Sequence, residues 1–472
     1  MELIHYFFKR YPVKSCKLES REIPFALIAV ILIFERFVFT APAIPLLDSA
    51  SIDGVTWKFT QKVPVERFVN GQLYVVGPVT ISSITPAPTN GRNGSVLNLS
   101  IDPAISGFDN RVSSPRFTEK LRVYPPIAMK PGDAIISSIS VDSIGVMGRW
   151  LMEGERTVSP VRSVSILTCL AAPVAADAFR PSYCDRGQKI YYADSLRRNL
   201  LPSLKMWRQG TPSINLFAQH FRRPWLDVCF FGFDAAIEYQ PDYGREVARA
   251  VGMASLLLCC DFPPAEKESL LVNFVQYGID LWGIARAGYR GWPAHGGHGS
   301  GRKWPIIFAG LLLGDSSMAA PNKMFPNLLF GEDMQTIEGN GWTGAKAVYA
   351  GHQGVINGKA VSKEAGWGPY EYMPPEAWGD SNKIGEDYRR CCTSVGWIGE
   401  ALSAHLLGAE KLWNHDAFFE YVDRWMTEDD AAAVAEIKRA KGWDYSAHWT
   451  RQRQCWDRFV ENMWELYRVG RN

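Results

Sequence analysis

Proton-transfer chemistry is best supported by the Gly-rich segment 289–302, which reads YRGWPAHGGHGSGR. His295 and His298 lie three residues apart in it, and Arg302 follows four residues after His298. An imidazole takes or gives a proton near neutral pH, and a guanidinium can pair a carboxylate through two hydrogen bonds. Together with a tyrosine as the acid, this set suits removal of the proton alpha to a carboxylate.

Each residue of this set has an expected role. Arg302 would neutralise the carboxylate and stabilise the enolate-like intermediate, and His295 or His298 would be the base. Tyr388 or Tyr289 would protonate the leaving oxygen. Two other interpretations stay open: a structural loop whose imidazoles satisfy backbone groups, and a divalent metal held by the two histidines. Because the spacing is short and a carboxylate ligand would have to come from elsewhere, we expect no cofactor and no metal.

A second pattern is the acidic pair Glu332-Asp333, which precedes a Gly- and Trp-rich stretch. Glycoside hydrolysis needs a pair of carboxyl groups, one as acid and one as base or nucleophile. Adjacent residues rarely face the same bond, so the partner would be Glu371, Glu376 or Asp380. The alternative is a solvated acidic turn.

A third pattern is the aromatic segment 367–390, WGPYEYMPPEAWGDSNKIGEDYRR. Flat aromatic faces stack on the C–H faces of sugar rings, and carboxylates between them can bind hydroxyl groups. We therefore expect a sugar-binding face here. The residues expected to contact substrate are Tyr243, Arg245, Trp292, Glu332, Asp333, His352, Trp367, Tyr370, Glu371, Tyr372, Trp378 and Arg389.

The elements that must position these residues differ between the two parts of the chain. Residues 48–170 contain β-branched runs of strand length, including 56–60, 73–84, 134–141 and 163–170, separated by Pro, Gly and Asn clusters. Short strands of this kind usually pack as two sheets. We expect an N-terminal β-sandwich domain.

Residues 171–189 lack an apolar period and are expected to be a linker, followed by a helical domain over 190–472. Apolar residues recur at helical spacing in 196–207, 246–260, 267–287, 304–313, 395–407, 417–426, 431–440 and 456–469. Long Gly-, Trp- and Pro-rich loops are expected between them, among them 340–387, and such loops are often functional.

The helical part contains an irregular repeat. Arg245, Arg302 and Arg390 each precede a helix that contains a small residue followed by Leu-rich turns. The repeat favours an (α/α) toroid in which the Arg-bearing helix starts gather on one face. The alternative is an irregular helical domain in which glycine merely lets helices pack closely.

The N-terminal segment 1–47 has the features of an export signal. Basic residues precede the apolar run 23–34, and Ala41-Pro42-Ala43 fits a cleavage site. The run is shorter than the ~20 residues that a bilayer span needs. We expect a signal peptide or signal anchor and a secreted or periplasmic protein, with membrane contact only through this segment. A wrongly assigned start or an apolar extension stays open.

The nine cysteines include no CxxC pair, so a thiolate zinc site is not expected. The neighbours Cys259-Cys260 and Cys391-Cys392 lie in apolar helical stretches and are expected to be buried free thiols. Cys169 and Cys184 could pair if the protein is exported.

The composition excludes several classes of protein. The chain has 472 residues, a formal charge of +2, 47% hydrophobic residues and 21% charged residues, which is typical of a globular protein. No long Lys/Arg run supports nucleic-acid binding, and the usual nucleotide, zincin and α/β-hydrolase motifs are missing. Most of the 17 Trp lie in the helical part, where they favour a polysaccharide partner.

The helix pairs, aromatic loops and His/Tyr/Arg set resemble the (α/α)-toroid polysaccharide lyases of the alginate- and heparinoid-lyase type. The resemblance is architectural and covers roughly 190–470. The Asn-His signature of the alginate lyases is not found, and the β module here precedes the toroid. FRPSYC (179–184) and GGHGSGRKWP (296–305) also resemble exported bacterial proteins to which no activity is attached.

The resemblance implies a carbohydrate-active enzyme that cleaves a uronic-acid-containing polysaccharide by β-elimination. A glycoside hydrolase on the same fold and a non-catalytic carbohydrate-binding surface protein are the alternatives.

Overall fold

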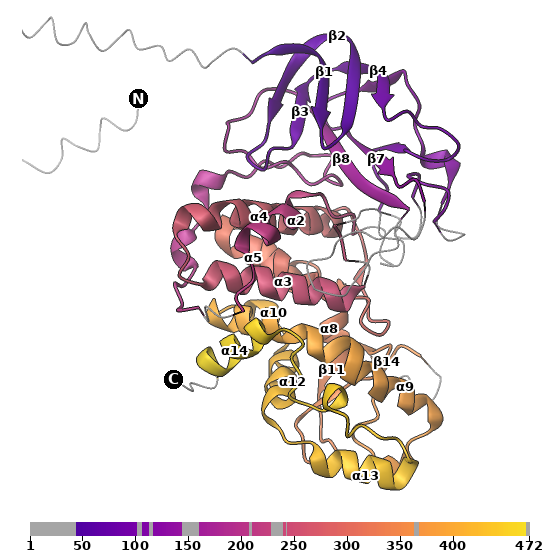
Figure 1. Ribbon diagram of the computed structural model, residues 1–472, viewed down its shortest axis with the longest axis vertical. Helices are drawn as coiled ribbons and strands as arrows, with labels where there is room; N and C mark the ends of the chain where they lie inside the picture. The colour runs from indigo at the N-terminus through magenta and orange to yellow at the C-terminus, as the bar shows by residue number, and fades with distance from the viewer. Residues whose placement is uncertain are drawn as a thin grey trace, which may run out of the picture. The chain divides into compact units, whose positions relative to one another are not determined.

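The computed structural model describes residues 44–101, 106–112, 117–143, 160–206, 210–227, 239–241, 243–362 and 368–468 (Figure 1). Almost all of the predicted export signal lies outside these residues. Within the ranges given, no helix is both long enough and apolar enough to cross a membrane. An N-terminal strand-rich region precedes a helical region, as the residue patterns predict.

The strands of the N-terminal region are β1 (Leu46–Ile52), β2 (Val55–Arg67), β3 (Leu73–Val76), β4 (Val79–Thr85), β5 (Ser95–Leu97), β6 (Ile127–Met129), β7 (Ala134–Ser140) and β8 (Val161–Leu170). Hydrogen bonding joins them in the order β5-β7-β8-β3-β2-β4-β6, with β1 also paired to β2. The start of β2 pairs with β4 and its end with β3, so the long strand connects two parts of the sheet. Val55, Trp57 and Phe59 of β2 alternate into an apolar core.

The helical region consists of α2 (Ile214–Arg222), α3 (Gly244–Cys259), α4 (Pro264–Arg286), α5 (Lys303–Leu313), α6 (Ser316–Ala319), α7 (Pro321–Met324), α8 (Gly331–Gln335), α9 (Asp380–Tyr388), α10 (Ser394–Leu406), α11 (Glu410–Trp413), α12 (Asp416–Thr427), α13 (Ala431–Lys441) and α14 (Arg458–Tyr467). Short strand pairs lie in its loops: β9 (Gly291–Trp292) with β10 (Leu329–Phe330), β11 (Thr336–Glu338) with β12 (Ala347–Tyr349), and β13 (Val355–Ile356) with β14 (Lys359–Ala360). A π-helical turn, η6 (Arg389–Thr393), joins α9 to α10.

The structure corrects three expectations about elements. The segment 196–207 was predicted to be a helix, but its described part contains only short turns such as η3 (Arg198–Leu200). Pro202 falls in the middle of the segment, where a proline removes a helical hydrogen bond and clashes with the preceding turn. Helix α2 was not predicted. Helix α9 lies inside the segment 340–387, which was expected to be a loop. Its polar sequence has little apolar periodicity, so the helix was not predicted.

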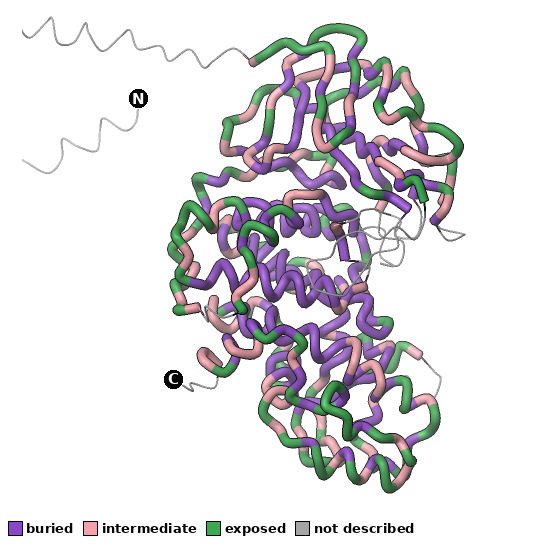
Figure 2. Tube along the Cα trace, viewed as in Figure 1, coloured by how far each residue is buried: buried purple, intermediate pink, exposed green. Residues whose placement is uncertain are grey.

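The core of the helical region lies around α3, α4 and α5. Nearly every residue of α3 is buried, whereas α13 buries only Val434 and Ile437, a contrast that Figure 2 shows along the chain. Helices α3 and α10 cross where Gly252 faces Gly399. A Cβ on Gly252 would stand 2.7 Å from the Gly399 Cα, so only glycine permits this crossing.

Arg180 of the predicted linker is fully buried and connects the two regions. Its guanidinium donates to Gln72, ahead of β3, and to Asp280 of α4 at 2.5 Å. The segment 179–184 therefore acts as a joint, and the residues Pro45–Asn472 form one compact unit.

The starts of α3 and α5 and the turn before α10 meet at the Gly-rich segment. A Cβ on Gly301 would lie 2.5 Å from the backbone nitrogen of Ala248, and one on Gly297 would lie 2.0 Å from the carbonyl oxygen of Cys392. Glycine at both positions is what lets these backbones approach the loop.

The cysteine predictions are partly wrong. Cys391 and Cys392 are joined in a disulfide and are not free thiols. The spacing of apolar residues predicts that the two cysteines are buried. It does not reveal that the backbone around them forms a π-helical turn and not an α-helix. Cys259 and Cys260 are buried free thiols, as predicted. Cys169 and Cys184 are both buried and neither is joined in a disulfide, so they do not form the pair considered above.

Candidate active site

Three histidines and two tyrosines form one cluster, called here the His–Tyr cluster: Tyr243, His295, His298, His352 and Tyr388. The ring centroids of His352 and Tyr388 are 4.4 Å apart, and those of His295 and His352 are 5.1 Å apart. His298 lies 5.5 Å from His295 and 4.7 Å from Tyr243. All five were predicted from the sequence to be site residues. His295, His298 and Tyr388 were expected to be catalytic, and Tyr243 and His352 to bind substrate.

Gly296 holds the cluster together because it has no side chain. Its φ is +58°, and a Cβ there would stand 2.4 Å from the Tyr388 ring. The amide nitrogen of Gly296 donates to the carbonyl oxygen of His352 at 3.0 Å. The buried side-chain amide of Gln335 donates to the carbonyl oxygens of Gly296 and His352, at 2.8 and 3.1 Å. These bonds fasten the loop that carries His295 to the loop that carries His352.

The cluster opens to solvent on the side of His295. His295 is exposed and Tyr388 and Tyr243 are half-buried, whereas His352 and His298 are buried. The side-chain amide of Gln353 lies 2.7 Å from His295 Nδ1, which orients the exposed ring. Exposed His295 and half-buried Tyr388 are therefore, together with Tyr243, the members of the cluster that lie nearest to solvent.

Burial favours the neutral forms of two members of the cluster, His352 and Tyr243. Burial, assisted by the neighbouring His295, lowers the pKa of His352 to about 4. Burial raises the pKa of Tyr243, whose hydroxyl oxygen accepts the Gly297 amide at 2.7 Å. An imidazole with a pKa this low is a weak base near neutral pH, so His352 is suited to accept a hydrogen bond and not to take a proton from a substrate.

Arg302 does not reach the open side of the cluster, which corrects its expected role as carboxylate neutraliser. Its buried guanidinium pairs with Asp227, Nε to Oδ1 at 2.9 Å. Its Nη1 also donates to the carbonyl oxygens of His298 and Ser300, at 2.9 and 2.8 Å. Arg302 therefore positions the Gly-rich loop from inside, because a buried guanidinium must find acceptors within the protein.

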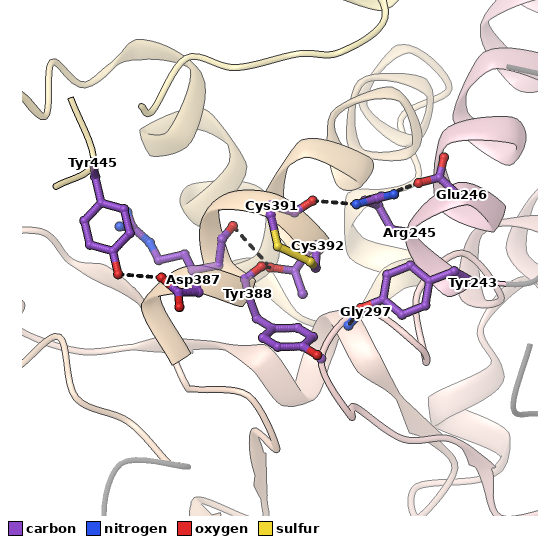
Figure 3. Close-up of a disulfide and its surroundings, with 12 residues drawn as sticks. Tyr243, Arg245, Glu246, Gly297, Asp387, Tyr388, Cys391, Cys392 and Tyr445 are labelled. Carbon is purple, nitrogen blue, oxygen red and sulfur yellow. Dashed lines mark hydrogen bonds and ion pairs between the residues drawn. A yellow bond between two sulfur atoms is a disulfide. The ribbon is translucent and has the colours of Figure 1, made fainter. Parts of the chain in front are cut away.

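Arg245, at the first turn of α3, is the arginine beside the cluster (Figure 3). Its guanidinium carbon is 5.5 Å from the ring centroid of Tyr243 and 4.5 Å from that of Trp456. Nη1 donates to the carbonyl oxygen of Cys391 at 2.9 Å, and Nε pairs with Glu246. Half-buried Arg245 is thus placed where a carboxylate could approach.

Two aromatic predictions in the Gly-rich loop are not supported by the structure. Tyr289 and Trp292 are buried against each other, with ring centroids 5.4 Å apart. The indole nitrogen of Trp292 donates to the Asp227 carbonyl oxygen. Both residues therefore belong to the apolar core.

The acidic pair Glu332-Asp333 is not a solvated turn, because Glu332 is buried and Asp333 is half-buried. Glu332 accepts the Gly301 amide, and burial raises its pKa. Burial and the nearby Glu332 raise the pKa of Glu400 as well. Asp333 pairs with buried Lys303 and accepts the Trp413 indole N–H at 2.9 Å. These carboxyls fasten α5 and α8 to their neighbours.

A separate pocket of about 250 Å³ takes in three of the residues expected to bind substrate: Glu371, Trp378 and Arg389. It is called here the Arg–Glu pocket, and its other polar and aromatic lining residues are Trp342, Thr343, Glu386, Arg390, Arg424, Glu428, Asp429, Asp430 and Gln452. Arg424 binds Glu371 through two hydrogen bonds, of 2.8 and 3.0 Å. Burial alone would raise the pKa of Glu371, but Arg389 and Arg424 outweigh it and lower that pKa to about 2.

The remaining predicted residues are dispersed. Tyr370 is buried and donates to Glu386, whereas Tyr372 is 56% exposed. Trp367 lies outside the described residues. Glu376 and Asp380 are exposed, so they do not face buried Glu371 across a common site.

Sequence reasoning missed Trp456, Gln353 and Gln335, whose isolated positions carry no local signal. The adjacent pair Cys391-Cys392 was visible, but its bond was not predicted. Among the residues that the structure describes, no group of three or more His, Cys, Asp or Glu side chains is arranged to hold a metal ion.

Comparison of the chain with protein-family models, with curated proteins and with solved structures finds no match.

Proposed function

We propose that the protein is an exported carbohydrate-active enzyme that cleaves a uronic-acid-containing polysaccharide by β-elimination at the His–Tyr cluster. The observation that carries the proposal is the contact of His352 with Tyr388, 4.4 Å between ring centroids, beside exposed His295. β-Elimination needs one group to take a carbon-bound proton and another to protonate the departing oxygen. The cluster offers both kinds of group within one site.

In the proposed reaction, His295 removes the proton alpha to the substrate carboxylate. The electron pair forms a double bond to the neighbouring carbon, whose bond to the glycosidic oxygen breaks. Tyr388 gives its phenolic proton to that oxygen. Arg245 takes the role first assigned to Arg302 and neutralises the carboxylate, because it is half-buried beside Tyr243.

Two further features agree with this proposal. Exposed Trp456, 36% accessible, offers a flat face next to Arg245 for a neighbouring sugar ring. A disulfide is favoured in oxidising compartments, which supports a secreted or periplasmic location. We also propose that the strand-rich region is a β-sandwich and that the helices form an (α/α) toroid, as the resemblance to toroid lyases implies.

A glycoside hydrolase is the second candidate, and the Arg–Glu pocket favours it. Five carboxylates line that pocket together with Trp342 and Trp378: Glu371, Glu386, Glu428, Asp429 and Asp430. Hydrolysis would use two of them across a glycosidic bond. Glu371, Glu386, Glu428 and Asp430 are each paired with an arginine, so a hydrolase reaction here would require at least one of these ion pairs to open.

The deciding experiment incubates the protein with a panel of uronate-containing polysaccharides and follows ultraviolet absorbance. A lyase makes an unsaturated uronate end that absorbs, and a hydrolase does not. Tyr388→Phe and His295→Gln should each lower the rate by about 100-fold or more. Tyr445→Phe is the control, since Tyr445 donates to Asp387 outside the cluster.

Reducing ends that appear without absorbance would reject elimination and support the hydrolase. Binding without any cleavage, unchanged in both cluster variants, would indicate a carbohydrate-binding surface protein instead.

A further inference from the structure

The bond between Cys391 and Cys392 joins two chain neighbours inside the π-helical turn η6 (Figure 3). Both residues are half-buried, so a small reductant can reach the sulfur atoms. Cysteines 169, 184, 259, 260 and 455 are not joined in disulfides. Within the described part of the chain, this bond is therefore the one covalent link that a reductant would open.

The turn that carries the disulfide contacts the His–Tyr cluster through its backbone. Tyr388 comes just before the turn, and its carbonyl oxygen accepts the Thr393 hydroxyl at 3.1 Å. The carbonyl oxygen of Cys391 accepts Arg245 Nη1 at 2.9 Å. The carbonyl oxygen of Cys392 lies against Gly297, where even a Cβ would not fit. A change in the direction of these carbonyls therefore acts on the acid, the arginine and the histidine loop together.

The disulfide restrains this backbone. A bond between adjacent side chains closes a small ring that includes the peptide between them, so the torsions of both residues are coupled. The hydrogen bonding of a π-helical turn is rarer than that of an α-helix and usually persists where local contacts require it. If the disulfide were reduced, this turn would be held by the hydrogen bonds of Thr393 and Arg245 without the covalent link.

We propose that Cys391–Cys392 is a thiol–disulfide exchange site whose oxidised form positions the His–Tyr cluster. A dithiol, small or protein-borne, attacks one sulfur as a thiolate, and the Cys391–Cys392 bond breaks. The reductant closes its own disulfide, and two electrons and two protons pass to the cysteines, which become thiols. The expected loss of activity on reduction rests on the proposed function. The disulfide itself and its effect on the loop that carries His295 and His298 do not depend on that function.

The test treats the native protein with dithiothreitol and alkylates it before peptide mapping. The peptide that spans 391–392 should carry two alkyl groups after reduction and none before. Hydrogen exchange of peptides covering 295–301 and 389–394 should become about tenfold faster on reduction. Cleavage of the uronate polymer should fall by about 100-fold, since displacement of catalytic groups by about 1 Å costs that much.

Two variants serve as controls. In Cys391→Ser/Cys392→Ser, hydrogen exchange of the peptides covering 295–301 and 389–394 should be as fast as in the reduced wild type. Dithiothreitol should not change it. Cys455→Ala, which removes a half-buried free thiol, should respond as the wild type does.

Alkylation of Cys391 and Cys392 in the absence of reductant would overturn the proposal. Reduction of the disulfide that leaves the hydrogen exchange of residues 295–301 unchanged would also overturn it. If reduction changes exchange in a protein that cleaves none of the polymers, the redox site stands and the proposed lyase activity fails.

Discussion

The ring of Tyr388 meets the ring of His352 edge-on, with centroids 4.4 Å apart and planes at 87°. Tyr388 ends α9, whereas His352 follows β12 in a separate loop. Gly296 lies against both rings, and a side chain at this position would displace them. This contact brings a phenol and a neutral imidazole together beside the exposed His295, and it is the basis of the proposed chemistry.

The pKa of His352 predicts how stability depends on pH. Burial lowers this pKa from 6.5 to about 4, so the unfolded chain binds the proton at higher pH than the folded chain does. Stability is fully present above the unfolded pKa and is lost as pH falls through about 4. His220, whose pKa is also lowered to about 4 by burial, adds to the same loss.

Chemical denaturation between pH 7 and pH 4 measures this effect. In His352→Gln the fall in unfolding free energy should be smaller than in the wild type, because one of the two histidines is gone. If the unfolding free energy of His352→Gln fell with pH as steeply as that of the wild type, His352 would have the same pKa in the folded and unfolded states.

Arg302 and Arg245 should respond differently to replacement by lysine. Arg302→Lys loses the fork that binds Asp227 and two carbonyl oxygens, so the unfolding free energy should fall by about 2 kcal/mol or more. Arg245→Lys should leave stability nearly unchanged and raise KM for a uronate polymer about tenfold. Thermal unfolding and initial rates of both variants check this pair of outcomes, and a raised KM in Arg302→Lys alone would reverse the two roles.

The buried pair of Glu371 with Arg424 should be more important for folding than the surface pair of Glu376 with Arg439. Glu371→Gln leaves Arg424 and Arg389 without their shared carboxylate inside the protein. We expect a loss of about 3 kcal/mol in the free energy of unfolding. Glu376→Gln, at an exposed pair, should cause little change. Equal effects in urea unfolding would contradict the buried network.

The crossing of α3 and α10 depends on Gly252. Gly252→Ala would place a Cβ 2.7 Å from the backbone of Gly399, which cannot move without separating the helices. The expected cost is about 2 kcal/mol, measured by chemical denaturation. Gly379→Ala is the comparison, because the nearest heavy atom to its Cβ would be 3.9 Å away. A fully stable Gly252→Ala protein would argue against the close crossing.

Local patterns in the sequence were sufficient for most of the secondary structure and for part of the candidate site. Alternation in β2 reports which face of the strand is buried. The apolar residues of α3 and α5 mark helices that are buried on nearly all sides. The spacing of His295 and His298 likewise lies within one loop. The position of Pro202 and the polar composition of α9 show where such patterns mislead.

The roles of charged residues were decided by tertiary structure. Nothing near Arg302 in the chain predicts that Asp227 supplies its partner, and that ion pair is the reason why Arg302 lies inside and Arg245 beside the cluster. Glu332 is interior for a similar reason, since the Gly301 amide reaches it from another segment.

The sequence by itself determined that strands precede helices and that a Gly-rich loop carries two histidines. Only the tertiary structure brought His352 and Tyr388 to that loop and joined Cys391 to Cys392 beneath it. The physical reason is that periodicity expresses the environment of a residue along one element, whereas a site requires side chains from several elements, each oriented by partners that are distant in the chain.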